Sequence, residues 1–320
     1  MKSNYSKIIF FSLMCISFSM KSQTQAEREV IVKNYDISKL KALRLKYSKD
    51  FNDEKNKAMF LAKKNGWKIK YMENGSYHEL ISVSEEGKPI YYKTDNLDAS
   101  ISTRTNFLHN NGGLGLDIEG QGMTAYVWDG GTARPSHQEY DGIGGDNRFS
   151  VGDNSDLSFH GAHVTGTIIA SGVISDAKGM APQAKAVGYD WNDDLAEATE
   201  AALNGMLISN HSYGYVTENI PDWWFGAYTI YAKEWDEIMY NSPYYLTVFS
   251  AGNDGQTSFN SDPLDGESQF DKINGNKTSK NSLIIANAQD AQINANGVLV
   301  SVARSSSSSE GPMDDLRIKP

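Results

Sequence analysis

Two segments of the sequence pair residue types that can move protons. Asp129 ends an apolar stretch and is followed by Gly130 and Gly131, which let the backbone turn sharply. His160 lies 31 residues further on, at the start of a helical run of small residues. A buried carboxylate costs several kcal/mol unless a donor satisfies it, and an imidazole N–H is such a donor. We therefore predict an Asp129–His160 pair for acid–base chemistry, although Asp-Gly after a strand is also common in turns.

A second histidine, His163, raises the alternative of a metal-dependent hydrolase. It follows His160 by three positions, which places both on one helix face. The zinc peptidase pattern instead spaces its histidines four apart with an intervening Glu, and the sequence has no such Glu. We therefore expect no metal at these histidines, and metal analysis of the purified protein would decide the alternative.

Two later segments could contact a peptide. Ser212, Tyr213 and Gly214 follow a short apolar strand, and an extended peptide could pair with such an edge through main-chain hydrogen bonds. Asn253 follows another apolar strand, 93 residues after His160, and its amide could donate to the oxyanion of a tetrahedral intermediate. Each segment alone also fits an ordinary strand end or turn.

The elements that would position these residues alternate between strands and helices after residue 101. We expect strands at residues 123–128, 184–189, 206–210, 246–250 and 282–288, and helices at 160–171, 195–204 and 228–240. Alternation of this kind indicates βαβ units, so the expected fold class is α/β, a doubly wound, mostly parallel sheet with helices on both faces. Functional loops of such sheets lie beyond the carboxyl ends of the strands, where the candidate residues fall.

The chain before residue 101 has a different character. Residues 1–23 show the basic start, 13-residue apolar run and polar exit of a secretory signal peptide, so we expect a secreted protein with no membrane segment in its mature form. Residues 24–100 predict a small α+β unit: helices up to residue 64 ended by Asn65-Gly66, then strands at 67–72, 79–83 and 89–93. The only cysteine, Cys15, lies in the signal peptide, which leaves no disulfide or thiolate site.

Charge separates the same two regions. Residues 24–100 carry 15 basic and 12 acidic side chains, whereas residues 101–320 carry 12 basic and 28 acidic ones. An acidic body argues against nucleic-acid binding, and a mildly basic unit ahead of it suggests an intramolecular partner held partly by charge.

Taken together, the motifs resemble those of the subtilisin-like serine peptidases, the subtilases, over about residues 105–320. The order Asp129, His160, Asn253 is the family's order, and residues 160–166, 179–182 and 251–253 are similar to its His, Gly-Val-Ala-Pro and oxyanion motifs. The resemblance implies that Asp129 orients His160, that His160 is the general base, that Asn253 stabilises the oxyanion, and that residues 212–214 bind a polypeptide substrate. It also implies that 24–100 is an inhibitory propeptide and 101–320 a subtilisin-like peptidase domain.

The family's nucleophile lies in a Gly-Thr-Ser-Met-Ala-x-Pro segment, and no such segment occurs in the 320 residues. Residues 304–320 resemble the stretch before it, so we expect a C-terminally incomplete domain that is inactive by itself. The serine run at 305–309 lacks the turn that exposes a reactive hydroxyl. The alternative is a non-catalytic peptide-binding protein with the same fold.

Two further segments concern metal binding and substrate specificity. No cofactor is required, but calcium is common in the family, and Glu139 with Asp141 forms a plausible acidic loop for it. Trp223, Trp224 and Phe225 form an aromatic insertion that we expect to pack on the following helix rather than line a substrate cleft.

Overall fold

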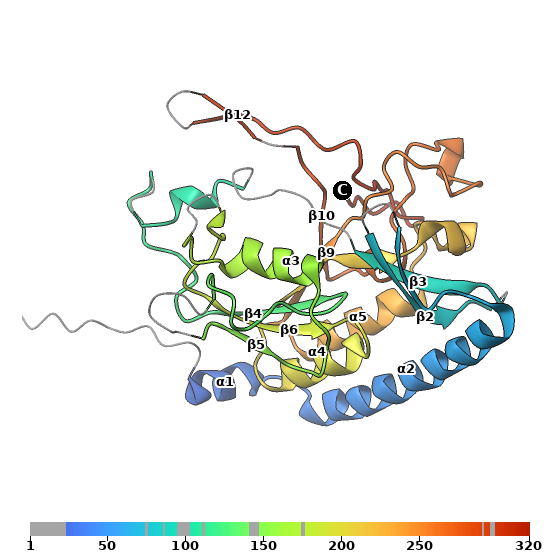
Figure 1. Ribbon diagram of the computed structural model, residues 1–320, viewed down its shortest axis with the longest axis horizontal. Coiled ribbons are helices and arrows are strands. Elements are labelled where there is room, and N and C mark those ends of the chain that lie inside the picture. Colours follow the sequence, from blue (N-terminus) through green and yellow to red (C-terminus); the bar gives the residue numbers. More distant parts are fainter. Residues whose placement is uncertain are drawn as a thin grey trace, which may run out of the picture.

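The computed structural model describes residues 24–73, 76–85, 87–94, 103–110, 113–140, 147–173, 177–289, 291–294 and 298–320. The predicted signal peptide lies outside these residues. Figure 1 shows the main sheet with α3 (Phe159–Ile169) on one face and α4 (Asp194–Leu203) and α5 (Ile230–Asn241) on the other. The long helix α2 (Ile37–Asn65) lies beyond α4 and α5. The expected α/β fold class is confirmed by this arrangement and by the strand order.

The N-terminal unit contains two helices and three strands. Its elements are α1 (Gln25–Val32), α2 (Ile37–Asn65), β1 (Lys70–Glu73), β2 (Ser76–Val83) and β3 (Pro89–Thr94). Gly66 ends α2 in the left-handed conformation, φ 72°, as Asn65-Gly66 predicted. The first strand starts three residues later than expected, because the Trp67 amide still donates to the carbonyl of Ala62 and keeps the chain turning.

The main sheet is parallel throughout. Within the described residues its order is β10-β9-β7-β4-β6-β5. The strands are β4 (Thr124–Asp129), β5 (Phe149–Val151), β6 (Lys185–Asp190), β7 (Ile208–His211), β9 (Leu246–Ser250) and β10 (Leu283–Ile285). Sequence reasoning missed β5, whose three residues are too short to show a pattern, and it predicted β10 four residues too long, one at its start and three at its end.

Helices cover the two faces of this sheet unequally. α4 (Asp194–Leu203) and α5 (Ile230–Asn241) cover one face, where Trp128, His211 and Phe249 are buried. α3 (Phe159–Ile169) covers the β4–β6–β5 half of the other face. On the remaining half, apolar side chains of β7, β9 and β10 are 37–48% exposed, namely Ile208, Leu246, Leu283 and Ile285. One half of the sheet is therefore apolar and open beside α3.

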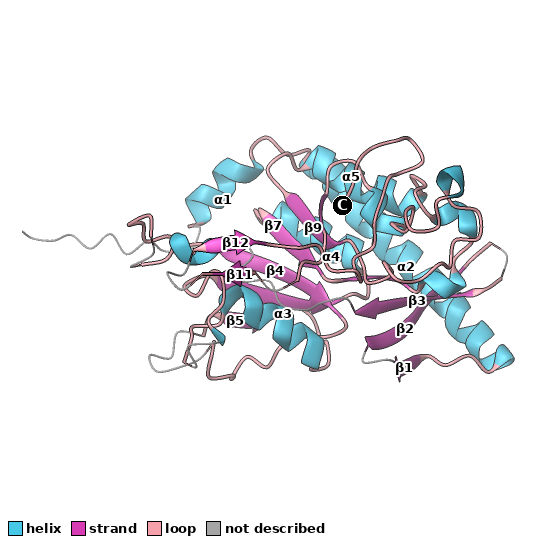
Figure 2. Cartoon of the chain, turned by 90° about the horizontal axis from the view of Figure 1, so that it is seen from above, coloured by secondary structure: helices cyan, strands magenta, loops and turns pink. Residues whose placement is uncertain are grey.

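The N-terminal unit packs against α4 and α5, as Figure 2 shows from above. Leu40, Leu43 and Tyr47 of α2 join the main hydrophobic cluster. Around them, Lys39, Arg44 and Lys46 form ion pairs with Glu237, Glu200 and Glu234. Exposed ion pairs contribute little to stability, so the apolar contacts carry most of this interface. These ion pairs join basic side chains of the N-terminal unit to acidic side chains of residues 101–320, in line with the opposite charge of the two regions.

The three residues of the aromatic insertion, Trp223, Trp224 and Phe225, differ in burial. Trp224 and Phe225 are 5% and 3% exposed and pack into the core, with the Trp224 ring 5.4 Å from that of Tyr231 on α5. Trp223 is 57% exposed.

Candidate active site

Asp129 is the last residue of β4 and is completely buried. Its side chain accepts a hydrogen bond from the Gly130 amide at 2.7 Å. In β4, residues alternate between the two faces of the sheet, and Trp128 belongs to the α4 side through its indole bond to Glu197. Asp129 therefore points toward α3.

His160 lies in the first turn of α3 and meets Asp129. Its Nδ1 is 2.8 Å from Oδ1 and 2.9 Å from Oδ2 of Asp129, and its side chain is 16% exposed. A carboxylate only accepts hydrogen bonds, so Nδ1 carries the hydrogen and Nε2 is the basic nitrogen. The predicted contact between Asp129 and His160 is therefore present.

The start of α3 is fixed to the loop after Asp129. Ser158 caps the helix by accepting from the Gly161 amide at 3.1 Å, and its own amide donates to the carbonyl of Thr132 at 2.8 Å. Gly161 packs so closely that a methyl group there would collide with the carbonyl oxygen of Gly131. The glycine in the histidine motif is thus explained by a close backbone approach.

Replacing Gly161 with Ala should therefore destabilise the protein by about 1–3 kcal/mol through overpacking. The new methyl group must push α3 away from the loop that carries Asp129. Urea unfolding measures the effect, and NMR of the His160 ring reports whether the hydrogen bond to Asp129 is lengthened.

Gly166→Ala is the matched control, because it adds the same methyl group to the same helix. The added carbon would lie 3.6 Å from the Tyr140 hydroxyl, an ordinary contact. We expect this variant to be neutral or more stable by up to about 1 kcal/mol. Equal effects of the two substitutions would contradict the role assigned to Gly161.

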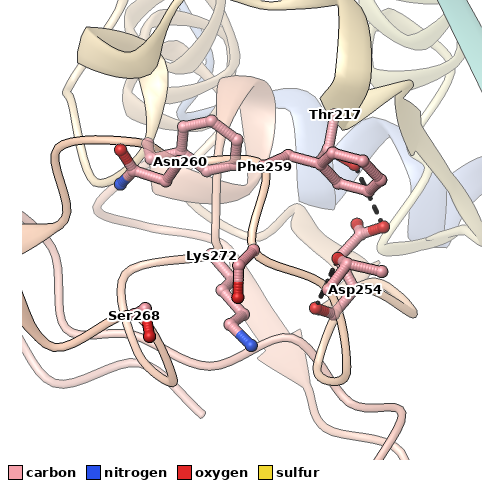
Figure 3. A pocket seen from close by; sticks show the side chains of 9 residues that line it. Thr217, Asp254, Phe259, Asn260, Ser268 and Lys272 are labelled. Carbon is pink, nitrogen blue, oxygen red and sulfur yellow. Dashed lines mark hydrogen bonds between the residues drawn. The ribbon is translucent and has the colours of Figure 1, made fainter.

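The loop that carries Asn253 is held on both sides. The Ser309 amide donates to the Gly252 carbonyl at 2.9 Å, and the Asp254 amide donates to the Ser309 hydroxyl at 3.0 Å. Thr217 donates to the Asp254 carboxylate at 3.1 Å, beside a small pocket shown in Figure 3. Asn253 itself is exposed. The serine run thus supports this loop, with Ser309 only 1% exposed.

The sheet places both parts of the candidate site on one edge. β4, β7 and β9 are adjacent parallel strands. Asp129 is the last residue of β4, and Asn253 follows the carboxyl end of β9. Neighbouring strands lie about 4.8 Å apart, so the two outer strands are about 10 Å apart. His163 is exposed, and the described residues contain no group of three His, Cys, Asp or Glu side chains able to hold a metal.

The predicted peptide-binding segment already has a partner strand. Tyr213–Tyr215 forms β8, which pairs antiparallel with β3 of the N-terminal unit. Tyr92 lies opposite Tyr215, and its ring contacts those of Tyr213 and Tyr215 at 5.1 and 5.0 Å. Ser212 precedes the strand and accepts from the Asn210 amide group. Sequence reasoning identified this edge but not the strand that covers it.

A buried polar chain lies behind this strand, and sequence reasoning missed it. The Tyr213 hydroxyl donates to Asp194 Oδ2 at 2.6 Å and lies 2.9 Å from Nδ1 of His211. His211 Nε2 is 2.8 Å from the Ser209 hydroxyl, which meets Tyr245. Burial raises the pKa of Asp194 to about 7, and burial lowers the pKa of His211 well below its ordinary value. The only sequence signal is polar residues within an apolar strand.

Glu139, one of the two acids considered for calcium, accepts main-chain hydrogen bonds. The Glu139 carboxylate accepts from the amides of Gly172 and Val173 at 2.8 and 3.1 Å, which satisfies a 4% exposed side chain. Asp141 lies outside the described residues.

Comparison with solved structures gives distant matches to proteases. The Clostridium perfringens CspB protease matches at 17% identity and TM-score 0.37, over 50% of this chain and 41% of that chain. The MycP3 protease of the type VII (ESX-3) secretion system matches at 13% identity and TM-score 0.32, over 71% and 79%. MycP1 with its propeptide removed matches at 19% identity and TM-score 0.29, over 60% and 76%. This chain thus spans less than half of CspB.

Comparison with protein families gives a broader result, whereas no curated protein sequence matches. The model of the subtilase family, peptidase S8, matches residues 74–320, which starts earlier than the resemblance at about residue 105 suggested. With a match over most of its length and an α/β fold of the expected class, the chain belongs to the subtilase family.

Proposed function

We propose that this protein is a secreted serine endopeptidase that uses Asp129 and His160 with a serine nucleophile. The contact between the buried Asp129 carboxylate and Nδ1 of His160 carries the proposal, since both oxygens lie within 2.9 Å of that nitrogen. A carboxylate in this position stabilises the imidazolium that forms when the histidine takes a proton.

The reaction is acyl transfer to serine and then to water. Nε2 of His160 removes the serine proton as the hydroxyl oxygen attacks the peptide carbonyl, and returns it to the leaving amine. Asn253 donates to the oxyanion of the intermediate, an interaction whose loss costs about 3 kcal/mol of barrier. Its place beyond β9, on the edge of the sheet where Asp129 ends β4, supports this role.

The nucleophile would come from a segment outside these 320 residues, which lack the family's Gly-Thr-Ser motif. The open half of the sheet supports this proposal, because its exposed Leu246, Leu283 and Ile285 lie on the face toward which Asp129 points. A helix that followed the serine could bury these side chains.

The polypeptide substrate would pair with the strand at Ser212–Gly214. Its pairing with β3 supports this assignment, since the strand accepts an extended partner through its main chain. Residues 24–100 would then act as an intramolecular propeptide that occupies the substrate strand until it is removed. Secretion rests on the signal-peptide pattern of residues 1–23; among the described residues, none of the helices is long and apolar enough to cross a membrane.

Casein cleavage tests the proposed activity. The 320-residue chain should not turn casein over, whereas a chain extended through the serine motif should cleave it, and His160→Ala should abolish that cleavage. Turnover by the 320-residue chain that His160→Ala removes would overturn the serine assignment.

The second candidate is a non-catalytic peptide-binding protein, which the β3–β8 pairing also favours. The reading frame beyond Pro320 distinguishes the two. A stop codon with peptide binding at β8 supports the binding protein, and continuation into a Gly-Thr-Ser motif supports the peptidase.

A further inference from the structure

The serine run at residues 305–309 lies against the loop that carries Asn253. On one side of Asn253, the Gly252 carbonyl accepts from the Ser309 amide at 2.9 Å. On the other side, the Asp254 amide donates to the Ser309 hydroxyl at 3.0 Å. Both chain neighbours of Asn253 are therefore bonded to one residue, the first through its main chain and the second through its side chain.

Gly252 allows this close contact. Its φ is 111°, and a methyl carbon placed on it would lie 2.8 Å from Oγ of Ser309. A side chain at residue 252 would therefore push the hydroxyl away from the loop. The glycine thus leaves room for the Ser309 hydroxyl beside Asn253.

Ser309 is itself held in place by the rest of the run. It is 1% exposed, and the Ser307 carbonyl accepts from the Gly255 amide at 3.0 Å. The Ser305 amide donates to the Asn287 carbonyl at 2.9 Å, just beyond the end of β10. The run therefore joins the chain after β10 to the chain after β9, and these two strands are neighbours in the sheet.

Asn253, in contrast, is exposed, so core packing does not fix its side chain. The place of its amide depends on the backbone on either side, and that backbone is bonded to Ser309. An oxyanion donor acts from the place where the charge develops, and a group misplaced by about 1 Å can lower a rate by about 10²-fold. The bonds of Ser309 therefore affect how well Asn253 can meet an oxyanion.

We propose that Ser309 is a positioning residue that holds Asn253 for oxyanion binding. This role rests on the proposed peptidase function, in which Asn253 is the oxyanion donor. Ser309 is buried, and its amide and hydroxyl both bond to the Asn253 loop, so it acts through Asn253 and does not touch the substrate. The serine run, which lacks the turn that exposes a nucleophile, supports the reaction in this indirect way.

The neighbouring Ser308 provides a matched comparison within the run. It is 0% exposed, and its hydroxyl accepts from the Asn287 amide at 3.1 Å and donates to the Ser309 carbonyl at 3.2 Å. These two bonds run to residues other than those of the Asn253 loop. Ser308→Ala therefore removes an equally buried hydroxyl without removing a bond to that loop.

Steady-state kinetics of the serine-bearing chain on a chromogenic peptide test this role. Ser309→Ala should lower kcat by about 10- to 100-fold and change KM by less than about twofold, because the oxyanion forms only in the transition state. Ser309→Cys keeps a weak acceptor and should lose less, and it carries the comparison if Ser309→Ala does not fold. Ser308→Ala should keep kcat near the parent value, and urea unfolding of each variant reports whether the two alanine substitutions destabilise the protein equally.

A double-mutant cycle with Asn253→Ala separates positioning from general structural support. Asn253→Ala alone should lower kcat by about 10²–10³-fold. In that background Ser309→Ala should lower kcat by less than about twofold more, since there is no amide left to position. The role of Ser309 is overturned if the two losses multiply, if Ser308→Ala lowers kcat as much, or if Ser309→Ala leaves kcat unchanged. A parent chain that cleaves no peptide would overturn the proposed peptidase function, and this role with it.

Discussion

Asp129→Asn should lower the peptidase rate of the serine-bearing chain by about 10⁴-fold. The carboxylate is fully buried and accepts from Nδ1 of His160 at 2.8 Å and from the Gly130 amide at 2.7 Å. An asparagine can keep the Gly130 bond with its oxygen at the Oδ1 position, but its NH₂ group then replaces Oδ2, 2.9 Å from Nδ1 of His160. An N–H group this close to a protonated Nδ1 is unfavourable, so the imidazole moves its hydrogen to Nε2, which removes the general base.

Initial rates on a chromogenic peptide measure this effect, with kcat and KM determined separately. The loss should fall on kcat, because neither Asp129 nor His160 is assigned to substrate binding. Asp156→Asn is the matched control: it removes an exposed carboxylate three residues before the α3 start and should leave kcat near the parent value. If Asp129→Asn changes only KM, the pair does not act in the chemical step.

The Asp129–His160 pair could be predicted from sequence because each residue sits at a fixed place in a regular element. Asp129 ends an apolar strand, and His160 lies in the first turn of a helix whose glycines indicate that another segment packs closely against it. The parallel sheet then brings strand ends to one edge, and the observed contact follows from local patterns plus one topological rule. Asn253 was placed on that edge for the same reason.

Contacts between segments that are far apart in the chain and belong to no common βαβ unit could not be predicted from the sequence. The pairing of β3 with β8 joins residues about 120 positions apart. Its hydrogen bonds run between main-chain groups, which every residue type has, so the amino-acid sequence does not indicate which strands pair. In the same way, Asp194 appears in the sequence as an ordinary acid in the first turn of a helix. Only the folded chain around it, including Tyr213 of β8, which donates to its carboxylate, leaves it 6% exposed.

Asp194→Asn should stabilise the protein at neutral pH by on the order of 4 kcal/mol. Burial raises the pKa of Asp194 to about 7, and the carboxylates of Asp193 and Glu234 add to the rise. An unfolded aspartate has a pKa of about 3.9, so between about pH 4 and 7 the folded protein keeps a proton that the unfolded chain releases. Stability of the parent therefore falls as pH rises through this window and levels off above it.

The asparagine variant has no proton to lose, and the buried chain can accommodate it. Its oxygen can accept from the Leu195 amide, which bonds Oδ1 of Asp194 at 2.8 Å. Its NH₂ group can donate to the Tyr213 oxygen, while the Tyr213 hydroxyl donates to Nδ1 of His211, 2.9 Å away.

Urea unfolding of parent and variant at several pH values between 4 and 8 measures this difference. The gap in unfolding free energy should widen by about 1.4 kcal/mol for each pH unit up to about 7 and then stay constant. Glu200→Gln, an exposed acid on the same helix, should show no comparable widening. A gap for Asp194→Asn that does not vary with pH would mean that the folded protein holds this carboxylate ionised, and that the strand at Tyr213 rests against a charge rather than a neutral acid.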